Sequence, residues 1–317
     1  MKRWIAPWLL IVFLTAPGWG QDPGVKLTRE ENRIVVAIDG QPFGDYYFGP
    51  EGGRPYVRPF LWPVRAADGV VVTSDQSQVT GDHPHHRSLW VGHGNVNGAD
   101  HWALHGEESP KQRHLGFDRV EGDTIVEKLA WEGTDHQPIL NETRTLRFFA
   151  LPDGNRGLDL TSVYTPIDGP VIFGDTKEAG LCAVRVAGEM AKTSTITEST
   201  GATSAQPKDE RLVWGKTADW CDISGRIGEK TYGVAMFDHP ANPRHPSNWH
   251  VRHYGLLAAN IFGLSAFDKA AAKHAGDLTM EPGKPVTFRY RVVVHMGDAK
   301  EAKLDEKYRQ YVASSGQ

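Results

Sequence analysis

Cysteine is almost absent from this chain, with 2 among 317 residues. Cys182 and Cys221 lie far apart in the sequence and no CxxC spacing occurs, which excludes a disulfide-rich scaffold and a cysteine-based zinc or redox motif. If the chain is exported, it meets an oxidising compartment in which the two thiols can pair. Two buried, unpaired thiols are the equally weighted alternative.

Long apolar runs are also absent, apart from a short one at the N-terminus. Lys2 and Arg3 precede the apolar segment 5–16, and small residues follow it before position 21. This order is typical of a secretory signal peptide. We therefore expect residues 1–20 to be a signal peptide and the protein to be periplasmic or extracellular, with an uncleaved anchor as the alternative. No later stretch has the roughly 18 apolar residues that a membrane span requires.

An excess of basic charge is lacking as well. The formal net charge is −4 and becomes more negative once the leader is removed, which argues against nucleic acid as a partner. The sequence contains no GxGxxG dinucleotide motif, phosphate loop, GxSxG elbow, HExxH zinc motif or EF-hand loop. We expect a small-molecule or carbohydrate substrate instead, from the side chains described below.

The dominant positive signal is a two-residue alternation of apolar and polar side chains. Val286, Phe288 and Tyr290 alternate with polar residues, as in a half-buried β-strand. The same pattern occurs in segments 33–38, 124–132, 141–150, 157–165, 180–187 and 230–237. Gly, Pro, Asp and Asn turns separate these segments, and no helical pattern lies between them. The sequence therefore predicts an all-β protein, a large antiparallel β-sandwich formed by a single domain over residues 21–317.

One helix is predicted, at the C-terminus. Asp298 and Glu301 have the spacing of a capping box. Leu304, Tyr308 and Tyr311 then fall on one face at helical spacing. We expect this helix to cover an edge or an end of a sheet.

Histidine is unevenly distributed, and half of the 14 histidines fall between His83 and His114. They lie in the long segment 78–115, which has few apolar runs and is rich in Gly, His and Asn. Loops of this length inside a compact domain tend to be functional. Imidazole both titrates near neutral pH and binds metals, so the cluster predicts a site of chemistry.

Within this cluster, His83 and His85 point to the same side of an extended chain and His86 to the other. Arg87 adds a fixed cation suited to a carboxylate or to sugar hydroxyls. For any one histidine, a hydrogen bond to a loop backbone group is the simpler explanation. For the whole cluster, a functional site is favoured.

A second histidine-rich segment covers residues 239–250 and contains three prolines. Asp238 ends a predicted strand, which puts His239 at the rim of a sheet. Trp249 offers a flat face on which a sugar ring can stack. The equally weighted alternative is a rigid proline-rich turn whose tryptophan packs on the core.

A third element is the run of Asp175, Lys177 and Glu178 between two predicted strands. A carboxylate beside an ammonium group usually forms a solvated surface pair of little consequence. In a cavity, the same groups make a general acid–base set.

Two sets of candidate site residues follow from these segments. The catalytic candidates are His83, His85, His86, Arg87, Lys177, Glu178, Asp238 and His239. The substrate-binding candidates are Trp90, His93, Asn95, Arg244, His245, Trp249 and His250.

These segments resemble a bacterial family labelled PmoA-like, or methane oxygenase PmoA. The resemblance is carried by segments 82–90, 92–98, 177–181, 220–222, 237–240, 242–246, 249–252 and 254–256. It implies an exported protein with a domain of unknown function, from bacteria rich in polysaccharide-degrading systems, and hence a role in carbohydrate metabolism. It does not imply a methane monooxygenase, because the membrane subunit of that enzyme has several apolar spans. The β-rich pattern is also similar to the large sandwich, or supersandwich, of galactose mutarotase and several polysaccharide lyases.

Three functions are consistent with the sequence. The first is a carbohydrate-active lyase, epimerase or glycoside-cleaving enzyme, in which histidines and Glu178 or Asp238 exchange protons and the pH profile has a limb in the histidine range. The second is a metal-dependent enzyme that binds a divalent metal through His83, His85 and His239. The third is a carbohydrate-binding protein without catalysis. No cofactor is otherwise expected.

Overall fold

The structure is a computed structural model that describes residues 24–50, 56–78 and 83–314. The predicted signal peptide and Asp82 of the first histidine motif lie outside the described residues. In the described part, none of the helices is both long enough and apolar enough to cross a membrane.

Two large antiparallel sheets form the described part of the chain. The first sheet has the spatial order β1 (Val25–Arg29), β2 (Arg33–Ile38), β3 (Gln41–Tyr47), β4 (Phe60–Leu61), β5 (Leu89–His93), β11 (Ala179–Arg185), β17 (Leu256–Ala259), β16 (Trp249–Arg252). The second sheet has the order β13 (Thr203–Ser204), β12 (Thr195–Glu198), β14 (Trp220–Ile227), β15 (Lys230–Asp238), β19 (Val286–Met296), β9 (Arg156–Pro166), β8 (Pro138–Ala150), β7 (Thr124–Glu132), β6 (Gln112–Glu121).

The remaining elements are short. They are β10 (Val171–Phe173), which pairs with β18 (Leu278–Met280), and the helices α1 (Gly188–Lys192), α2 (Leu264–Phe267) and α3 (Leu304–Ser314). Single 3-10 turns cover Gln76–Gln78, Gly106–Glu108 and Pro207–Leu212.

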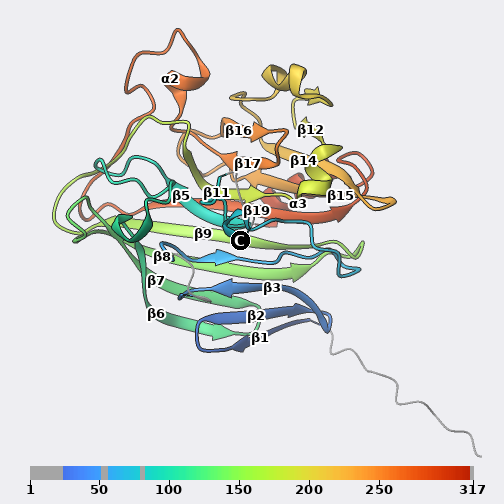
Figure 1. The fold of residues 1–317 in the computed structure, drawn as a ribbon, viewed down its shortest axis with the longest axis horizontal. Coiled ribbons are helices and arrows are strands. Elements are labelled where there is room, and N and C mark those ends of the chain that lie inside the picture. The colour runs from blue at the N-terminus through green and yellow to red at the C-terminus, as the bar shows by residue number, and fades with distance from the viewer. Residues whose placement is uncertain (1–23, 51–55, 79–82, 315–317) are drawn as a thin grey trace, which may run out of the picture.

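The two sheets pack face to face, as Figure 1 shows for β1 to β3 in front of β6 to β8. Strand β2 contacts β8 at one end of the sandwich, and β17 contacts β15 nearer the other. One apolar cluster fills the space between the sheets and includes Ile34 and Val36 of β2 and Leu146 and Phe148 of β8. This arrangement confirms the predicted antiparallel β-sandwich.

Both cysteines are free thiols that are buried in this core. Cys182 lies on β11 in the first sheet and Cys221 on β14 in the second. Of the two alternatives that the sequence leaves open, the structure shows the unpaired thiols.

The alternation of side chains predicts seven of the 19 strands in the described residues, each to within a few residues. Strands β2 and β7 have the predicted bounds, and β8, β9, β11, β15 and β19 differ from them by a few residues at their ends. The loop predicted over residues 78–115 is wrong at Leu89–His93, which form β5. Every residue of β5 is buried, so its sequence lacks the alternation by which the other strands were found.

The outer face of the first sheet carries a second apolar cluster, which positions the candidate site. Alternate residues of β5 and β11 point away from the core, so Trp90 and Ala183 pack there with Tyr47 and Phe60. Because the histidine loop leads directly into β5, it lies over this outer face.

The C-terminal helix α3 covers the other side of the molecule, on the outer face of the second sheet. Leu304 and Tyr311 pack there against Phe237 and Val293. The predicted capping box forms, since Glu301 N donates to Asp298 Oδ1 at 2.9 Å and Asp298 N donates to Glu301 Oε2 at 3.0 Å. The regular helix begins later than predicted, at Leu304.

A buried ion pair lies between the sheets on β8. Arg144 Nε and Nη2 each donate to one carboxylate oxygen of Glu142 at 2.8 Å. Trp131 Nε1 and Ser162 Oγ donate to the same carboxylate, both at 2.7 Å. The Glu142 charge is therefore surrounded by donors, which offsets its loss of water.

The same network joins the two sheets. Arg144 Nη2 also donates to Gln112 Oε1 at 3.1 Å, and Gln112 Nε2 donates to the backbone oxygen of Val91 in β5 at 3.0 Å. Arg144 thus holds β5, the strand that leads into the candidate site, against the second sheet.

We expect Arg144→Met to destabilise the protein by about 3–5 kcal/mol, because it leaves the Glu142 charge buried without its partner. Urea unfolding followed by circular dichroism measures this change. The control is Arg147→Met on the same strand, whose side chain is 50% exposed and pairs with Asp159. Loss of that exposed pair costs less than about 1 kcal/mol. Equal losses in the two variants would contradict the role of the network.

Candidate functional site

The candidate site forms where the chain leaves β5 and enters β11. Residue Ala179 pairs with His93, so Gly94 and Glu178 meet at the same end of the two strands. Gly94 N donates to Glu178 O at 2.7 Å. A Cβ atom at position 94 would lie 3.0 Å from that oxygen and 3.2 Å from Glu178 Cβ. A side chain at position 94 would have to push this neighbouring segment away by a few tenths of an ångström, so glycine allows the segment that follows β5 to lie beside Glu178.

A cavity of about 430 Å³ opens at this junction. It is lined by His83, His85, Gly94, Asp100, Trp102, Ala103, Thr176, Lys177, Glu178, His250, Arg252 and Tyr254. Members of all three regions selected from the sequence are present, and five of them are candidate residues. These are His83, His85, Lys177, Glu178 and His250.

A column of four stacked rings holds the histidine loop on the sheet. Trp90 stacks on His86 at 5.1 Å, His86 on His83 at 4.8 Å, and His83 on Tyr254 at 5.0 Å between ring centres. Trp90 lies at the sheet, whereas His83 and Tyr254 line the cavity. The column therefore fixes the wall of the cavity to the strand below it.

His86 is the buried support of this column and does not line the cavity. Arg185 Nη1 lies 3.0 Å from His86 Nδ1, and a guanidinium can only donate, so Nδ1 accepts and the imidazole is neutral. Burial, with the nearby charges of His85 and Arg185, lowers the pKa of His86 far below its usual value. The catalytic role predicted for His86 is therefore replaced by a structural one.

His85 lies half-buried in the cavity near Trp102. No hydrogen bond joins its ring to another residue in the described ranges. Burial lowers the pKa of His85 to about 4, the Arg58 guanidinium and His83 add to this effect, and Glu178 opposes it. His85 is thus a neutral imidazole at physiological pH that feels the charge of Glu178.

His250 lies on β16, far from the histidine loop in the sequence, and its side chain lines the same cavity. Its Nδ1 lies 2.5 Å from the backbone oxygen of Lys177, which can only accept, so Nδ1 carries the proton. Burial lowers the pKa of His250 to about 4, and Glu178 again opposes the effect. The neutral ring therefore keeps the lone pair of Nε2 as a proton acceptor.

Glu178 and Lys177 form an ion pair at the mouth of the cavity, with side chains 40% and 46% exposed. Asp175, the third acidic or basic group of this segment, accepts from the backbone N–H groups of Ser265 and Gly276 instead. Asp175 therefore anchors the loop, while Glu178 supplies a carboxylate within electrostatic reach of His85 and His250.

Asp100 is the other carboxylate of the cavity, and it is fully engaged. Its Oδ1 accepts from the backbone N–H groups of Trp102 and Ala103 at 2.8 and 2.9 Å, and its Oδ2 lies 2.9 Å from His105 Nε2. Burial alone would raise the pKa of Asp100, but these hydrogen bonds hold it below its usual value. Asp100 is therefore an ionised, fixed group.

Of the proline-rich segment 239–250, His250 is the one residue that lines the cavity. Asp238 is buried and accepts from Asn242 Nδ2, Ser247 N and His245 Nδ1 at 2.7, 2.7 and 2.9 Å. His239 packs on Tyr311 of α3 at 5.4 Å between ring centres. The predicted catalytic roles of Asp238 and His239, and the binding role of His245, are corrected to structural roles in a rigid loop.

Arg244, Arg87 and Trp249 are likewise engaged away from the cavity. Arg244 Nη1 donates to Gly276 O at 2.7 Å. Arg87 Nε lies 2.7 Å from Asp75, and its guanidinium stacks on Phe60. Trp249 points into the core and donates to Ala218 O at 2.9 Å, so its ring holds no sugar.

The remaining binding candidates, His93, Asn95 and Trp90, do not line the cavity. His93 packs between Phe173 and Phe262 in the core, and its Nδ1 accepts from Asn95 N at 3.0 Å. Asn95 Oδ1 accepts from Gly98 N at 2.9 Å. Trp90 is the base of the ring column. The structure gives each of the three a role in holding the loop that carries Gly94.

The proposed metal ligands do not come together. His83 and His85 share the cavity, but His239 lies beside α3 on the second sheet. Among the residues that the structure describes, no group of three His, Cys, Asp or Glu side chains is arranged to hold a metal ion.

Seven cavity residues were not selected from the sequence, and the four with charged or aromatic side chains are Asp100, Trp102, Arg252 and Tyr254. Asp100 and Trp102 lie in the long segment predicted to be functional, where a count of histidines overlooks them. On β16, Trp249 and Val251 are buried in the core, so His250 and Arg252 point to the other face. Because a strand places alternate residues on one face, the selection of His250 could also have indicated Arg252 as a cavity residue.

The family model that matches residues 33–309 is that of a family of unknown function, DUF6807, and the chain belongs to this family. This match corrects the PmoA-like assignment made from the sequence motifs. A search of curated proteins finds no matching relative.

Two solved structures are similar in overall arrangement. One is a GalM/aldose epimerase homologue from C. elegans, with 8% identity and a TM-score of 0.40, covering 87% of this chain and 99% of that one. The other is the α-N-acetylgalactosaminidase NagBb from Bifidobacterium bifidum, with 12% identity and a TM-score of 0.34, covering 92% of this chain and 38% of that one. Both TM-scores lie below 0.5, so the likeness gives no residue correspondence.

We expect His250 to remain neutral down to about pH 4, as the tautomer protonated at Nδ1, because burial disfavours the imidazolium. Histidine 15N NMR over a pH titration reports both the tautomer and the pKa, and the spectrum of His250→Gln assigns the signal. A titration near the ordinary value of about 6.5 would contradict this description of the site.

Proposed function

We propose that this member of a family without an assigned reaction is a carbohydrate-active enzyme of the epimerase or lyase class, with Glu178 as its base. The observation that carries the proposal is the placement of Glu178 in one cavity with the neutral imidazoles of His85 and His250, on both of which its charge acts. A carboxylate and neutral imidazoles together provide proton acceptors and hydrogen-bond donors at one substrate.

Each group has a role in such a reaction. Glu178 accepts a proton as a C–H or O–H bond of the sugar breaks, and the electron pair stays on the substrate. Where an O–H bond breaks, the Lys177 ammonium, which pairs with Glu178, donates a proton to the ring oxygen as the ring C–O bond opens. Where a C–H bond breaks, it donates a proton to the leaving oxygen as the adjacent C–O bond breaks. His85 and His250 orient the sugar through their uncharged ring nitrogens.

The ionisation state of Asp100 argues against a glycosidase that uses two carboxylates and favours an enzyme that transfers a proton. A glycosidase of that kind needs one carboxylic acid that is protonated at neutral pH. The hydrogen bonds to Asp100 keep its pKa low, so it cannot hold that proton. This supports an epimerase or lyase over a glycoside-cleaving enzyme.

The walls of the cavity support a carbohydrate as the substrate. Trp102 and Tyr254 provide aromatic surfaces on which the apolar face of a sugar ring stacks. Asp100, Lys177 and Glu178 provide acceptors and donors for its hydroxyl groups. A volume of about 430 Å³ falls in the range of small-molecule sites.

We expect Glu178→Gln to lower turnover by about 10²- to 10⁴-fold while sugar binding is retained, because the amide keeps the shape but cannot accept the proton. Mono- and oligosaccharides, uronic acids included, are incubated with the protein in D2O. Proton NMR then detects hydrogen exchange, epimers and unsaturated products. The matched control is Glu229→Gln in an exposed turn, which leaves turnover unchanged. Saccharide binding by the wild type without any turnover would show a binding protein instead.

We expect kcat/KM to stay nearly constant from pH 7 to about 5 and to fall as the pH approaches 4. His85 and His250 have pKa values of about 4, so only below this range do the imidazoles gain a charge. The profile is measured on the substrate found above. A decline centred near pH 6.5 would mean that a histidine of ordinary pKa controls the reaction.

A further inference from the structure

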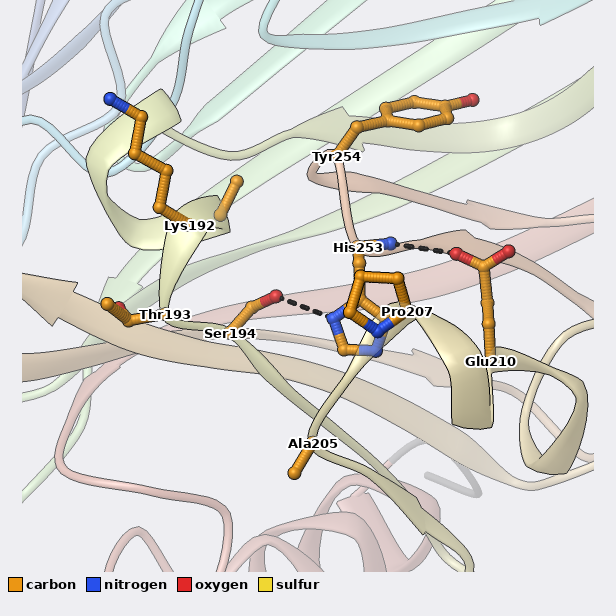
Figure 2. A pocket seen from close by; sticks show the side chains of 9 residues that line it. Lys192, Thr193, Ser194, Ala205, Pro207, Glu210, His253 and Tyr254 are labelled. Carbon is orange, nitrogen blue, oxygen red and sulfur yellow. Dashed lines mark hydrogen bonds between the residues drawn. The ribbon is translucent and has the colours of Figure 1, made fainter.

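A second cavity of about 490 Å³ lies beside the first. Figure 2 shows its lining side chains, which come from the end of α1, the segment after it, the 3-10 turn near Glu210 and the turn between β16 and β17. They belong to Ala191, Lys192, Thr193, Ser194, Ala205, Pro207, Glu210, His253 and Tyr254. No candidate residue selected from the sequence lies in this cavity.

A fixed set of hydroxyl and imidazole groups forms its floor. Ser204 Oγ donates to Gln206 O at 3.1 Å, so it accepts from His253 Nε2 at 2.8 Å. His253 Nδ1 then accepts from Ser194 Oγ at 3.1 Å, as the dashed line in Figure 2 marks. Burial lowers the pKa of His253, which agrees with this neutral ring.

These hydrogen bonds give the cavity a definite chemistry. The Ser194 hydroxyl donates its hydrogen bond to His253, so its oxygen lone pairs remain available to accept hydrogen bonds from a ligand. In a nucleophilic triad, a carboxylate would accept a hydrogen bond from His253 Nε2. Here Nε2 is bonded to the Ser204 hydroxyl, so Ser194 and His253 do not form such a triad. The Glu210 carboxylate and the Lys192 ammonium complete the polar lining. Such a mixture of acceptors and one cation suits a neutral, hydroxyl-rich ligand.

Two residues connect this cavity to the candidate active site. Tyr254 lines both cavities. Arg252 lines the first, and its Nη1 donates to Glu210 of the second. Because Arg252, His253 and Tyr254 are consecutive in one tight turn, this single turn contributes side chains to both cavities.

We infer that the second cavity is a further saccharide subsite, and that the substrate is an oligosaccharide, or the end of a polysaccharide, that passes over Tyr254. One sugar unit lies beside Glu178 in the first cavity, and the next lies against Ser194 and Glu210 in the second. This inference rests on the proposed function, because it assigns the substrate class of the same site.

The test is the dependence of affinity on chain length. Calorimetry with mono- to tetrasaccharides of the neutral xylose, mannose and galactose series gives the dissociation constants for Glu178→Gln, which binds without turnover. We expect the disaccharide of the series that binds to do so at least ~10-fold more tightly than its monosaccharide, as about two further hydrogen bonds provide. Equal affinities for all lengths would overturn the subsite.

A variant that fills the second cavity locates the effect. Ala205 is exposed at the rim, so Ala205→Trp occupies the cavity without disturbing the core. We expect this variant to lose the ~10-fold gain from the second sugar unit. The control is Ala270→Trp, an exposed position that lines neither cavity, which keeps the gain. A gain that persists in Ala205→Trp would overturn the assignment.

The two proposals fail in different ways. If affinity rises with chain length and Ala205→Trp removes the rise, but no saccharide is turned over by the wild type, the subsite stands and the catalytic function fails. If Glu178-dependent turnover occurs but chain length has no effect, the subsite fails and the catalytic function stands.

Discussion

The approach of Gly94 to Glu178 is the contact on which the candidate site depends. It joins the last residue of one loop to the first residue of another through a backbone hydrogen bond of 2.7 Å. Glycine leaves room for it, since a Cβ at position 94 would press on both the backbone and the side chain of residue 178 and would require them to shift by a few tenths of an ångström. The cavity, its carboxylate and its histidines are all arranged around this junction.

Burial decides the chemical state of the histidines that surround Glu178. A histidine-rich loop suggests groups that change charge near pH 6.5, yet burial lowers the pKa values of His85 and His250 to about 4. The site therefore combines one charged carboxylate with uncharged imidazoles. This asymmetry favours removal of a proton by Glu178 and hydrogen bonding by the rings, and it moves the expected acid limb of activity away from the usual histidine range.

Part of the fold was predictable from the sequence, because several long strands have one face on the core and one face outside it. The alternation in 33–38 and 124–132 reproduces β2 and β7 because their two faces differ in environment. Strand β5 was missed because both of its faces are buried, one in the core and one under the histidine loop. The capping box at Asp298 formed as predicted, but the regular helix started later, at Leu304.

The sequence by itself determined the three segments that supply the candidate residues of the cavity: the histidine loop, the run that ends at Glu178 and the segment that ends at His250. Only the tertiary structure decided which members share a cavity. Asp238 and His239 precede His250 by only 12 and 11 residues, yet they lie at the second sheet, while His250 lies on the first. The physical reason is that pairing between strands distant in sequence, from β5 through β11 and β17 to β16, sets the neighbours of each side chain. Local sequence patterns indicate the strands and the faces of each, but they do not specify their partners.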